Sequence, residues 1–408
     1  MKGRMQKVSE CNFKKVLVAN RGEIAIRVFR ACYDLGLHTV AMYSNEDTYA
    51  LFRTKADEAY LIGENKSPLG AYLDIPAILD LARRRGVDAI HPGYGFLSEN
   101  ADFARACEAA GINFVGPPSH ILAQMGDKLA AKATAIACNV PTIPGSTEPL
   151  KDADDAVARA VSYGFPIILK AAAGGGGRGM RRCDNEEEVR LQFQLVKNEA
   201  KKAFGNEDIF IEKFLVEPKH IEVQILADKH GNVYHLGERD CSVQRRHQKL
   251  IEESPSPAVS RSQRKKLMDQ VTKAVKAIGY VGVGTLEFLL DRDGRFWFME
   301  MNLRLQVEHG VTEMLTKNDL VKWQIRVAAG VPLNFRQQDV SLSGACLECR
   351  INATRPGTLT MLHVPGGPFV RFDTYLVAGT TVSPYYDSLL GKLIVYAGTR
   401  EEALRKMK

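Results

Sequence analysis

Two glutamates and an asparagine near residue 290 supply oxygen atoms of the kind that bind Mg²⁺. Glu287 lies in GTLEFLL, and Glu300 and Asn302 lie in WFMEMN, with a turn at residues 291–294 between these apolar stretches. If the stretches pair as an antiparallel hairpin, the three side chains converge on one face. A carboxylate among apolar neighbours is costly to bury unless it is paired or binds a cation. The pattern therefore predicts a Mg²⁺ site, because Mg²⁺ prefers oxygen ligands and phosphates; the alternative is a pair of exposed strand carboxylates.

The residues that follow, NLRLQVEH (302–309), alternate between polar and apolar types. At strand period, Asn302, Arg304, Gln306 and Glu308 point to one face. A cation, an amide and a carboxylate beside a Mg²⁺ site are suited to bind an oxyanion and remove its proton. We expect Arg304 to clamp the anion and Glu308 to act as the base. The alternative is the polar face of an amphipathic strand.

A glycine run indicates a phosphate-binding loop. Gly174, Gly175, Gly176 and Gly177 are consecutive, and Lys170 precedes them at the end of an apolar stretch. Without side chains, the backbone N–H groups are free to approach a polyphosphate closely. The run also matches G-x-G-x-x-G, but MRRC follows it and predicts a returning strand rather than a helix, so a dinucleotide site is not supported. A flexible surface hairpin is the alternative.

A strongly basic segment, QRRHQK (244–249), requires an anionic partner or full solvation. Glu238 and Asp240 lie close to it in the sequence, so internal ion pairing is a third option. The net charge of the chain is +7, but its basic clusters are scattered and lack interleaved aromatic residues. We therefore expect an anionic small substrate and no nucleic acid.

The elements that must position these residues fall into three regions. From Val16 to about residue 118, short apolar runs alternate with amphipathic segments, for example the strand 38–43 and the helix 101–111. This alternation predicts a doubly wound parallel sheet. A second region of strands and helices begins near residue 126, and a strand-rich region begins near residue 341. The predicted domains are 1–125, 126–340 and 341–408.

The composition also limits the environment of the protein. The chain has 408 residues and 45% hydrophobic composition, without a run approaching the ~20 apolar residues that a membrane span needs. No apolar segment near the N-terminus resembles a secretory signal. The eight cysteines are dispersed, and Cys346 and Cys349 lie in a segment that alternates like a strand, so metal binding is not expected. We expect a cytoplasmic protein without a membrane association.

Together, these segments resemble the biotin carboxylases of the ATP-grasp superfamily, the components of acetyl-CoA and pyruvate carboxylases. The similarity rests on segments that occur in the family's order and spacing over nearly the whole chain: VANRGEIAIR, HPGYGFLSEN, GDK, KAAAGGGGRGM, KHIEVQIL, ERDCSVQRRHQK and MEMNLRLQVEH. The resemblance implies a pre-ATP-grasp domain, then an ATP-grasp fold with a mobile lid at about 142–215.

The resemblance also implies roles for individual residues. It places ATP phosphates at Lys128, Lys170 and Lys249, and one or two Mg²⁺ (or Mn²⁺) ions at the glutamate–asparagine set. Bicarbonate would lie against Lys249, Arg304, Gln306 and the Val307 backbone, with Glu308 as its base. Arg350 would stabilise the enolate-like transition state of biotin. The remaining residues that it places at the nucleotide are Glu212, Lys213, His220, Gln244 and His247.

The resemblance further implies partners, and the sequence departs from the family at a few positions. No Ala-Met-Lys-Met motif occurs, so biotin would arrive on a carrier protein or domain, and a carboxyltransferase and a homodimer are also implied. Leu303, Gly310 and Thr354 replace residues that are usual in the family. Relatives also continue past the final residues REEALRKMK. The alternatives are therefore another ATP-grasp carboxylate–amine ligase, or an inactive Mg-ATP-binding subunit that lacks a C-terminal segment.

Overall fold

The N-terminal region forms the predicted parallel sheet. The structure, a computed structural model, describes residues 11–126, 128–171, 179–204 and 206–408. The first sheet has the order β3-β2-β1-β4-β5, and all its neighbouring strands are parallel. Its strands are β1 (Lys15–Val18), β2 (His38–Tyr43), β3 (Glu58–Leu61), β4 (Ala89–His91) and β5 (Asn113–Phe114).

Helices cover both faces of this sheet. Leu17 packs in one core with Ile78 and Phe103, whereas its neighbour Val16 packs in a second core with Phe29. Successive residues of β1 thus point to opposite, equally apolar faces, as a buried parallel strand requires. The doubly wound prediction is confirmed. The helical segments of this region are α1 (Gly22–Asp34), η1 (Asn45–Asp47), η2 (Leu51–Lys55), α2 (Pro68–Tyr72), α3 (Ile75–Arg85) and α4 (Ala101–Ala109).

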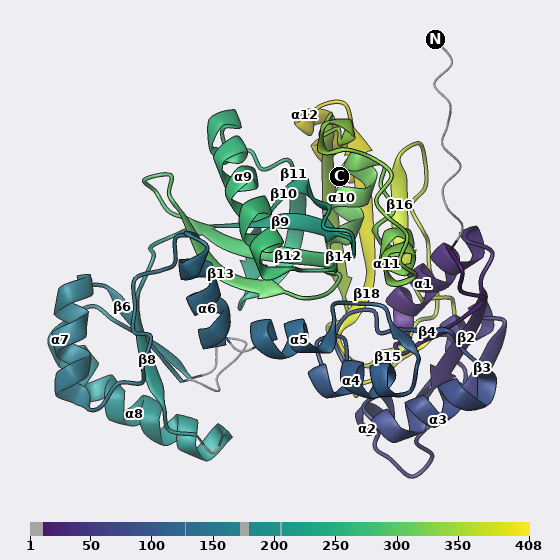
Figure 1. Cartoon of the computed structure of the whole chain (residues 1–408), viewed down its shortest axis with the longest axis horizontal. Helices are drawn as coiled ribbons and strands as arrows, with labels where there is room; N and C mark the ends of the chain where they lie inside the picture. The colour runs from purple at the N-terminus through teal and green to yellow at the C-terminus, as the bar shows by residue number, and fades with distance from the viewer. Residues whose placement is uncertain (1–10, 127, 172–178, 205) are drawn as a thin grey trace.

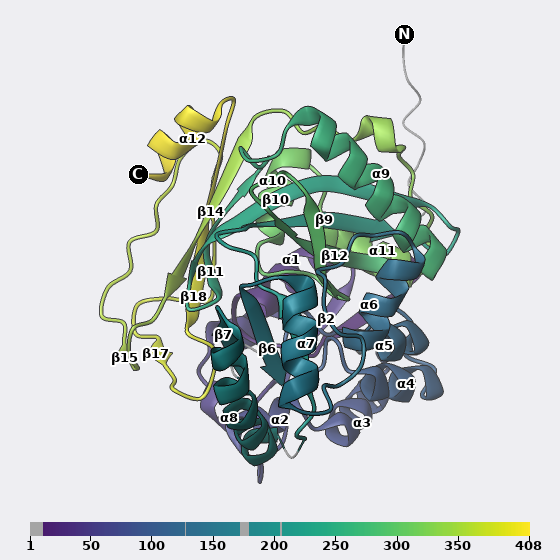
Figure 2. The same cartoon turned by 90° about the vertical axis from the view of Figure 1, so that its left-hand side faces the viewer.

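A separate small layer lies across from this sheet. Two helices, α5 (Ser119–Gly126) and α6 (Lys128–Ala137), lead into it, and Figure 1 shows it at the left end of the molecule. Its three-stranded sheet has the order β7-β6-β8 and an apolar core of its own that includes Ile167, Leu169 and Ile211. Figure 2, which faces this layer, shows its two helices in front. Its elements are α7 (Ala153–Tyr163), β6 (Ile167–Ala171), β7 (Met180–Cys183), α8 (Glu186–Phe204) and β8 (Ile209–Lys213).

An eight-stranded antiparallel sheet forms the centre of the molecule. Its order is β13-β12-β9-β10-β11-β14-β18-β16. The pairing of β11 with β14 makes the strand-rich C-terminal region a continuation of the same sheet that carries the glutamate hairpin. The strands are β9 (Lys219–Ala227), β10 (Val233–Arg245), β11 (Gln248–Ser254), β12 (Gly282–Leu290), β13 (Phe296–Asn302), β14 (Ala345–Asn352), β16 (Val370–Thr374) and β18 (Leu389–Ala397).

The remaining elements surround this central sheet. They are α9 (Arg261–Ile278), α10 (His309–Thr316), α11 (Leu320–Ala328), η3 (Gln337–Asp339), α12 (Arg400–Met407) and the two-stranded pair β15 (Gly357–Thr358) and β17 (Thr381–Val382). None of the helices in the described part of the chain combines the length and apolar character that a membrane crossing needs.

One local prediction is wrong. The strand expected to run on through 302–308 ends at Asn302, and the chain turns into α10 with Glu308 as its N-cap residue. The turn forms because the Gln306 carbonyl accepts hydrogen bonds from the His309 backbone N–H at 3.2 Å and pairs with His309 Nδ1 at 2.8 Å. Leu303 and Leu305 are buried, but Gln306 and Glu308 are buried as well, so the segment does not have the polar face and apolar face that a strand would give it.

Candidate active site

Most of the predicted site residues meet in one place. A cleft of about 1730 Å³ opens between the small layer and the central sheet. Its walls include the predicted residues Lys170, Glu212, Lys213, His220, Gln244, His247, Lys249, Glu287, Glu300, Asn302, Arg304, Gln306, Val307 and Arg350. Glu308 lies fully buried behind the wall. The side chain of Lys128 and the glycines Gly175, Gly176 and Gly177 lie outside the described residues.

The glutamate hairpin places its oxygens as predicted. Glu287 on β12 is the direct cross-strand partner of Glu300 on β13, so both side chains leave the same face of the sheet. Asn302 Nδ2 donates to Glu287 Oε1 at 2.9 Å. Two carboxylates and an amide at the wall of a cleft are the oxygen donors that Mg²⁺ prefers, and their chemistry fits that ion. The Lys249 ammonium and the His220 ring also contact Glu287, at 2.9 Å each.

Lys249 links three carboxylates. It lies on β11, and its Nζ contacts Glu222 at 2.6 Å, Glu308 at 2.7 Å and Glu287 at 2.9 Å. Burial alone would lower the pKa of Lys249, but these carboxylates raise it well above its ordinary value. Burial would likewise raise the pKa of Glu287, yet Lys249 and His220 lower it to about 2. Lys249 is therefore a permanent cation, and it holds Glu287 as a permanent anion.

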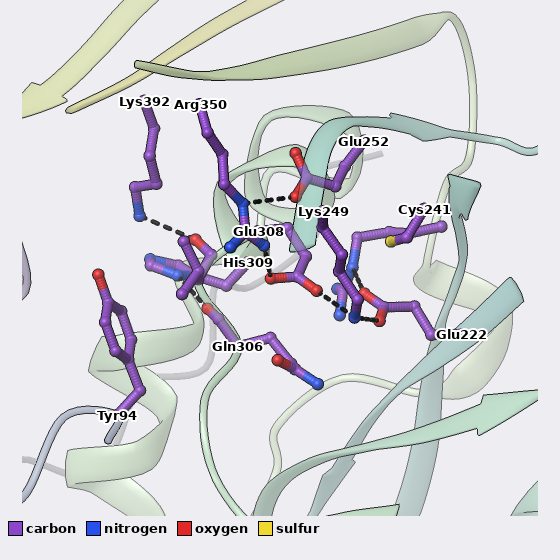
Figure 3. A network of polar contacts seen from close by, with 12 residues as sticks. Tyr94, Glu222, Cys241, Lys249, Glu252, Gln306, Glu308, His309, Arg350 and Lys392 are labelled. Atoms are coloured by element: carbon purple, nitrogen blue, oxygen red, sulfur yellow. Dashed lines mark hydrogen bonds and ion pairs between the residues drawn. The ribbon is translucent and has the colours of Figure 1, made fainter. Parts of the chain in front are cut away.

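Glu308 lies between two cations (Figure 3). Its Oε1 contacts Lys249 Nζ at 2.7 Å, and its Oε2 accepts from Arg350 Nη2 at 2.9 Å. Although its burial acts in the opposite direction, Lys249, Arg350 and Arg239 lower the pKa of Glu308 well below the ordinary value. The carboxylate is thus ionised at any physiological pH and is available to accept a proton.

Arg304 and Gln306 form a polar edge beside this carboxylate. The Arg304 guanidinium donates to Asn302 Oδ1 at 3.1 Å and to Gln306 Oε1 at 3.2 Å. On its other side, Arg304 Nε donates to Glu99 Oε2 at 2.8 Å. The planar guanidinium is thereby fixed, with a geometry that suits a planar oxyanion.

The small layer contributes its own charged group to the opposite wall. Glu212 on β8 contacts Lys170 on β6, and its Oε1 lies 3.3 Å from Lys132 Nζ. Burial would raise the pKa of Glu212, but the two lysines lower it. Lys213 instead donates to the carbonyl oxygens of Gly164 and Phe165, at 2.7 and 2.8 Å.

Internal ion pairing and solvation, two of the three explanations offered for the basic segment, each apply to a part of it. Lys249 is ion-paired inside the site, whereas Arg245 and Arg246 are exposed at the β10–β11 turn. Gln244 Nε2 lies 3.1 Å from His220 Nδ1, and His220 Nε2 lies 2.9 Å from Glu287 Oε2.

Several contributing residues are absent from the sequence-based prediction. Buried Glu222 and Arg239 pair with each other, and Glu222 also binds Lys249. Lys392, fully buried on β18, donates to the Val307 carbonyl at 2.8 Å and lies 3.2 Å from Glu23. The two-residue spacing of Glu222 from His220 signalled a shared strand face. No signal marked Lys392, which lies in an apolar strand.

Comparisons with known proteins show which family the chain resembles. Residues 12–122 match the model described as "Biotin carboxylase, N-terminal domain", and residues 127–336 match "Carbamoyl-phosphate synthase L chain, ATP binding domain". Residues 348–408 match "Biotin carboxylase C-terminal domain". Biotin carboxylase 1 of Bacillus subtilis is 49% identical over 97% of this chain and 90% of its own length.

The chain belongs to the biotin carboxylase family. The small subunit of 2-oxoglutarate carboxylase from Hydrogenobacter thermophilus is 52% identical, over 97% of this chain and 85% of its own length. A crystal structure of the biotin carboxylase domain dimer of that enzyme, with MgADP, ADP and bicarbonate, has a TM-score of 0.92 and 51% identity and covers 97% of this chain and 88% of the other. The biotin carboxylase of Campylobacter jejuni in an ATP-type complex has a TM-score of 0.93 and 45% identity, over 97% and 90% of the two chains.

Membership confirms the predicted fold and enzyme class. The chain has the fold of the family: a parallel N-terminal sheet, an ATP-grasp region and a strand-rich C-terminal region. The prediction of a ligase that carboxylates biotin with ATP, Mg²⁺ and bicarbonate is confirmed at the level of the family. It is favoured over an unrelated carboxylate–amine ligase.

Proposed function

We propose that the cleft performs the first half-reaction of a biotin-dependent carboxylase with the residues described above. Bicarbonate binds against Arg304, Gln306, Lys249 and the Val307 backbone. Glu308 takes its proton while a bicarbonate oxygen attacks the γ-phosphorus of ATP. The bond from that phosphorus to the β-phosphate oxygen breaks, and the products are carboxyphosphate, ADP and protonated Glu308. The observation that carries the proposal is Glu308, buried and ionised between Lys249 and Arg350.

The low pKa of Glu308 determines when its proton transfer occurs. A strongly ionised carboxylate is a weak base, so it will not deprotonate bound bicarbonate in the ground state. As the new oxygen–phosphorus bond forms, the bicarbonate hydroxyl becomes more acidic, and the transfer becomes favourable. Deprotonation is therefore coupled to attack, which limits the reaction to the moment when ATP is in place.

Charged groups on both walls position the triphosphate. Lys170 with its partner Glu212 lies on the small layer, and Lys249 lies on the central sheet. Glu287, Glu300 and Asn302 would hold Mg²⁺, which supplies charge neutralisation for the phosphates when it is bound. Phosphoryl transfer depends mainly on such positioning and electrostatic stabilisation. Closure of the lid, about 142–215, would exclude water.

The second step uses the opposite side of the same site. Carboxyphosphate breaks down to CO₂ and phosphate, phosphate takes the biotin N–H proton, and the biotin nitrogen bonds to the CO₂ carbon. Arg350, which is anchored beside Glu308, stabilises the enolate-like oxygen of biotin. Biotin arrives on a carrier protein or domain, and a separate carboxyltransferase component takes the carboxyl group onward. We also infer a homodimer located in the cytoplasm.

A steady-state assay tests this function. With Mg·ATP, the chain should release ADP only when bicarbonate is present, and free biotin should raise the rate. ATP binding without bicarbonate-dependent ADP release would instead identify an inactive nucleotide-binding subunit. Sedimentation across a range of protein concentrations tests the dimer independently.

A further inference from the structure

A second pair of buried glutamates lies directly behind Arg350. Glu252 on β11 and Glu348 on β14 are cross-strand partners in the antiparallel pair that joins the two halves of the central sheet. Directly opposed residues have side chains on the same face, with their Cβ atoms about 4.5–5.5 Å apart. Both residues are 0% exposed. Two buried carboxyl groups therefore lie side by side, next to the residue that faces the biotin side of the site.

These glutamates have few hydrogen-bond donors. Glu252 Oε1 accepts from Arg350 Nε at 2.7 Å. Within the described part of the chain, Glu252 Oε2 and both oxygens of Glu348 have no hydrogen-bonding partner. An ionised carboxylate that is buried without donors is costly, and two of them side by side are more so. One proton placed between the two groups removes both costs, because the protonated group donates to the ionised one.

The charged groups around Glu252 and Glu348 favour a single proton shared between the two carboxyl groups. Lys392 is the nearest buried cation from β18, but its Nζ is engaged by the Val307 carbonyl and Glu23. The first turn of α10 covers the pair, since a Cβ on Gly310 would lie 3.3 Å from Glu348 Oε2. The other titratable groups that act on the pair are Lys249, Glu308, Arg350 and the thiols Cys241, Cys346 and Cys349.

We propose that Glu348 is protonated and shares its proton with Glu252, and that this pair positions Arg350 for its role beside Glu308. This inference rests on the proposed function, because it gives Arg350 a task in it. The ionised Glu252 holds the Nε side of the guanidinium, so the Nη2 side reaches Glu308 (Figure 3). When Glu308 takes up the bicarbonate proton, its attraction for Arg350 falls. Glu252 then keeps the guanidinium in place while its freed N–H faces the reacting oxygens.

The pKa shifts of the two glutamates agree with this geometry. Burial raises the pKa of Glu252 to about 7 against the lowering effect of Arg350, and burial raises that of Glu348 well above its ordinary value. The two groups titrate as a pair: one proton is held throughout the physiological range, and a second binds as the pH falls through about 7. The second proton neutralises Glu252 and releases the Nε side of Arg350.

Infrared spectroscopy tests the shared proton without any turnover. At about pH 9, where Glu252 is ionised, the full chain should show the C=O stretching band of a buried carboxylic acid, and the band should shift in D₂O. Glu348→Gln should abolish it, whereas Glu308→Gln and Glu253→Gln should retain it. Absence of the band from the wild type, or its persistence in Glu348→Gln, would overturn the proposal. A wild type with the band but without bicarbonate-dependent ADP release would overturn the proposed function alone.

A matched pair of variants tests the positioning role. Glu348→Gln keeps a donor to Glu252, so kcat should stay within about threefold. Glu348→Met has similar volume but no donor, so kcat should fall about tenfold, the size of one lost hydrogen bond, with the KM for ATP unchanged. The acid limb of kcat should move to higher pH in Glu348→Met only. Equal shifts in both variants would contradict the proposal, and the infrared result decides the case if the methionine variant does not fold.

Discussion

Two sets of buried glutamates flank Arg350, and their charge states differ although their burial is nearly the same. Glu287 is 4% exposed and Glu308 is 0% exposed, and cations contact both on the cleft side. Glu252 and Glu348 are both 0% exposed and share a single described donor, the Nε of Arg350. The pKa values accordingly move in opposite directions. The number of nearby donors, not the depth of burial, decides which carboxyl group is an anion ready for chemistry.

The largest effect is expected when Glu287 and Glu308 lose the lysine that contacts both of them. Lys249→Met removes the cation that contacts three carboxylates and should destabilise the fold by about 3–5 kcal/mol, the cost of breaking a buried ion pair. It should also abolish bicarbonate-dependent ADP release, because Glu308 loses one of its two cations. Chemical denaturation and the steady-state assay measure the two effects. Lys15→Met, which removes only a contact with Glu58 in the N-terminal sheet, is the control and should keep full activity.

Glu308→Gln removes the proposed proton acceptor and leaves Glu287 and Lys249 in place. The amide keeps the shape of the side chain but takes no proton, so bicarbonate-dependent kcat should fall by about 10²–10⁴. Binding of Mg·ATP, measured by calorimetry, should change little. Glu253→Gln is the matched control on β11, since Glu253 pairs with Arg400 on α12 at 3.1 Å from Nη2. Retention of bicarbonate-dependent turnover in Glu308→Gln would remove the base from the mechanism.

The contribution to the free energy of unfolding should change with pH in opposite directions for Glu287 and Glu252. Glu287 has its pKa lowered from 4.5 to about 2, so its stabilisation is complete above pH 4.5 and is lost as the pH falls toward 2. Glu252 has its pKa raised from 4.5 to about 7, so it destabilises the fold progressively as the pH rises from 4.5 to 7, by about 3 kcal/mol in total. Urea denaturation from pH 5 to 8 should therefore show a slope that Glu252→Gln flattens. An unchanged slope would contradict the raised pKa of Glu252.

Arg304→Lys should have the smallest effect. Arg304 contacts Asn302, Gln306 and Glu99 through a planar fork that lysine does not reproduce. We expect the KM for bicarbonate to rise about tenfold, with kcat and the KM for ATP within a factor of about two. The carboxylate pairs on either side of Arg350 do not contact Arg304, so the acid limb of the pH profile should stay in place. A shift of that limb would show that the two regions are coupled.

Local patterns were sufficient to predict much of the molecule. The alternation of apolar runs and amphipathic segments predicted the parallel sheet, and the turn expected around 291–294 predicted that Glu287 and Glu300 lie on adjacent strands, where they are direct partners. The polar spacing in 302–308 singled out Arg304, which lines the cleft, and Glu308, which contacts Lys249 and Arg350, although the segment is a turn and not a strand. In each case the information lies in segments that are close together in the sequence.

The rest depends on pairing between distant segments. Lys249 and Glu308 are 59 positions apart, and Glu252 and Arg350 are 98 apart. The second contact exists because β11 pairs with β14, a sheet order that no local pattern encodes. Lys249 stood out only as part of a basic segment, and its specific role, like that of Arg350, came from the family resemblance. Glu348 and Lys392 were not identified, since a charged residue in an apolar strand does not reveal its partners.

Isotope transfer from bicarbonate tests the central claim most directly. If a bicarbonate oxygen attacks the γ-phosphorus, then bicarbonate labelled with heavy oxygen will pass one labelled atom to each phosphate released, provided that the incubation is shorter than label exchange with water. Mass spectrometry of the phosphate reads this out. We predict one labelled oxygen per phosphate in the presence of biotin. Phosphate that carries only solvent oxygen would mean that water attacks ATP, and the proposed role of this site would be wrong.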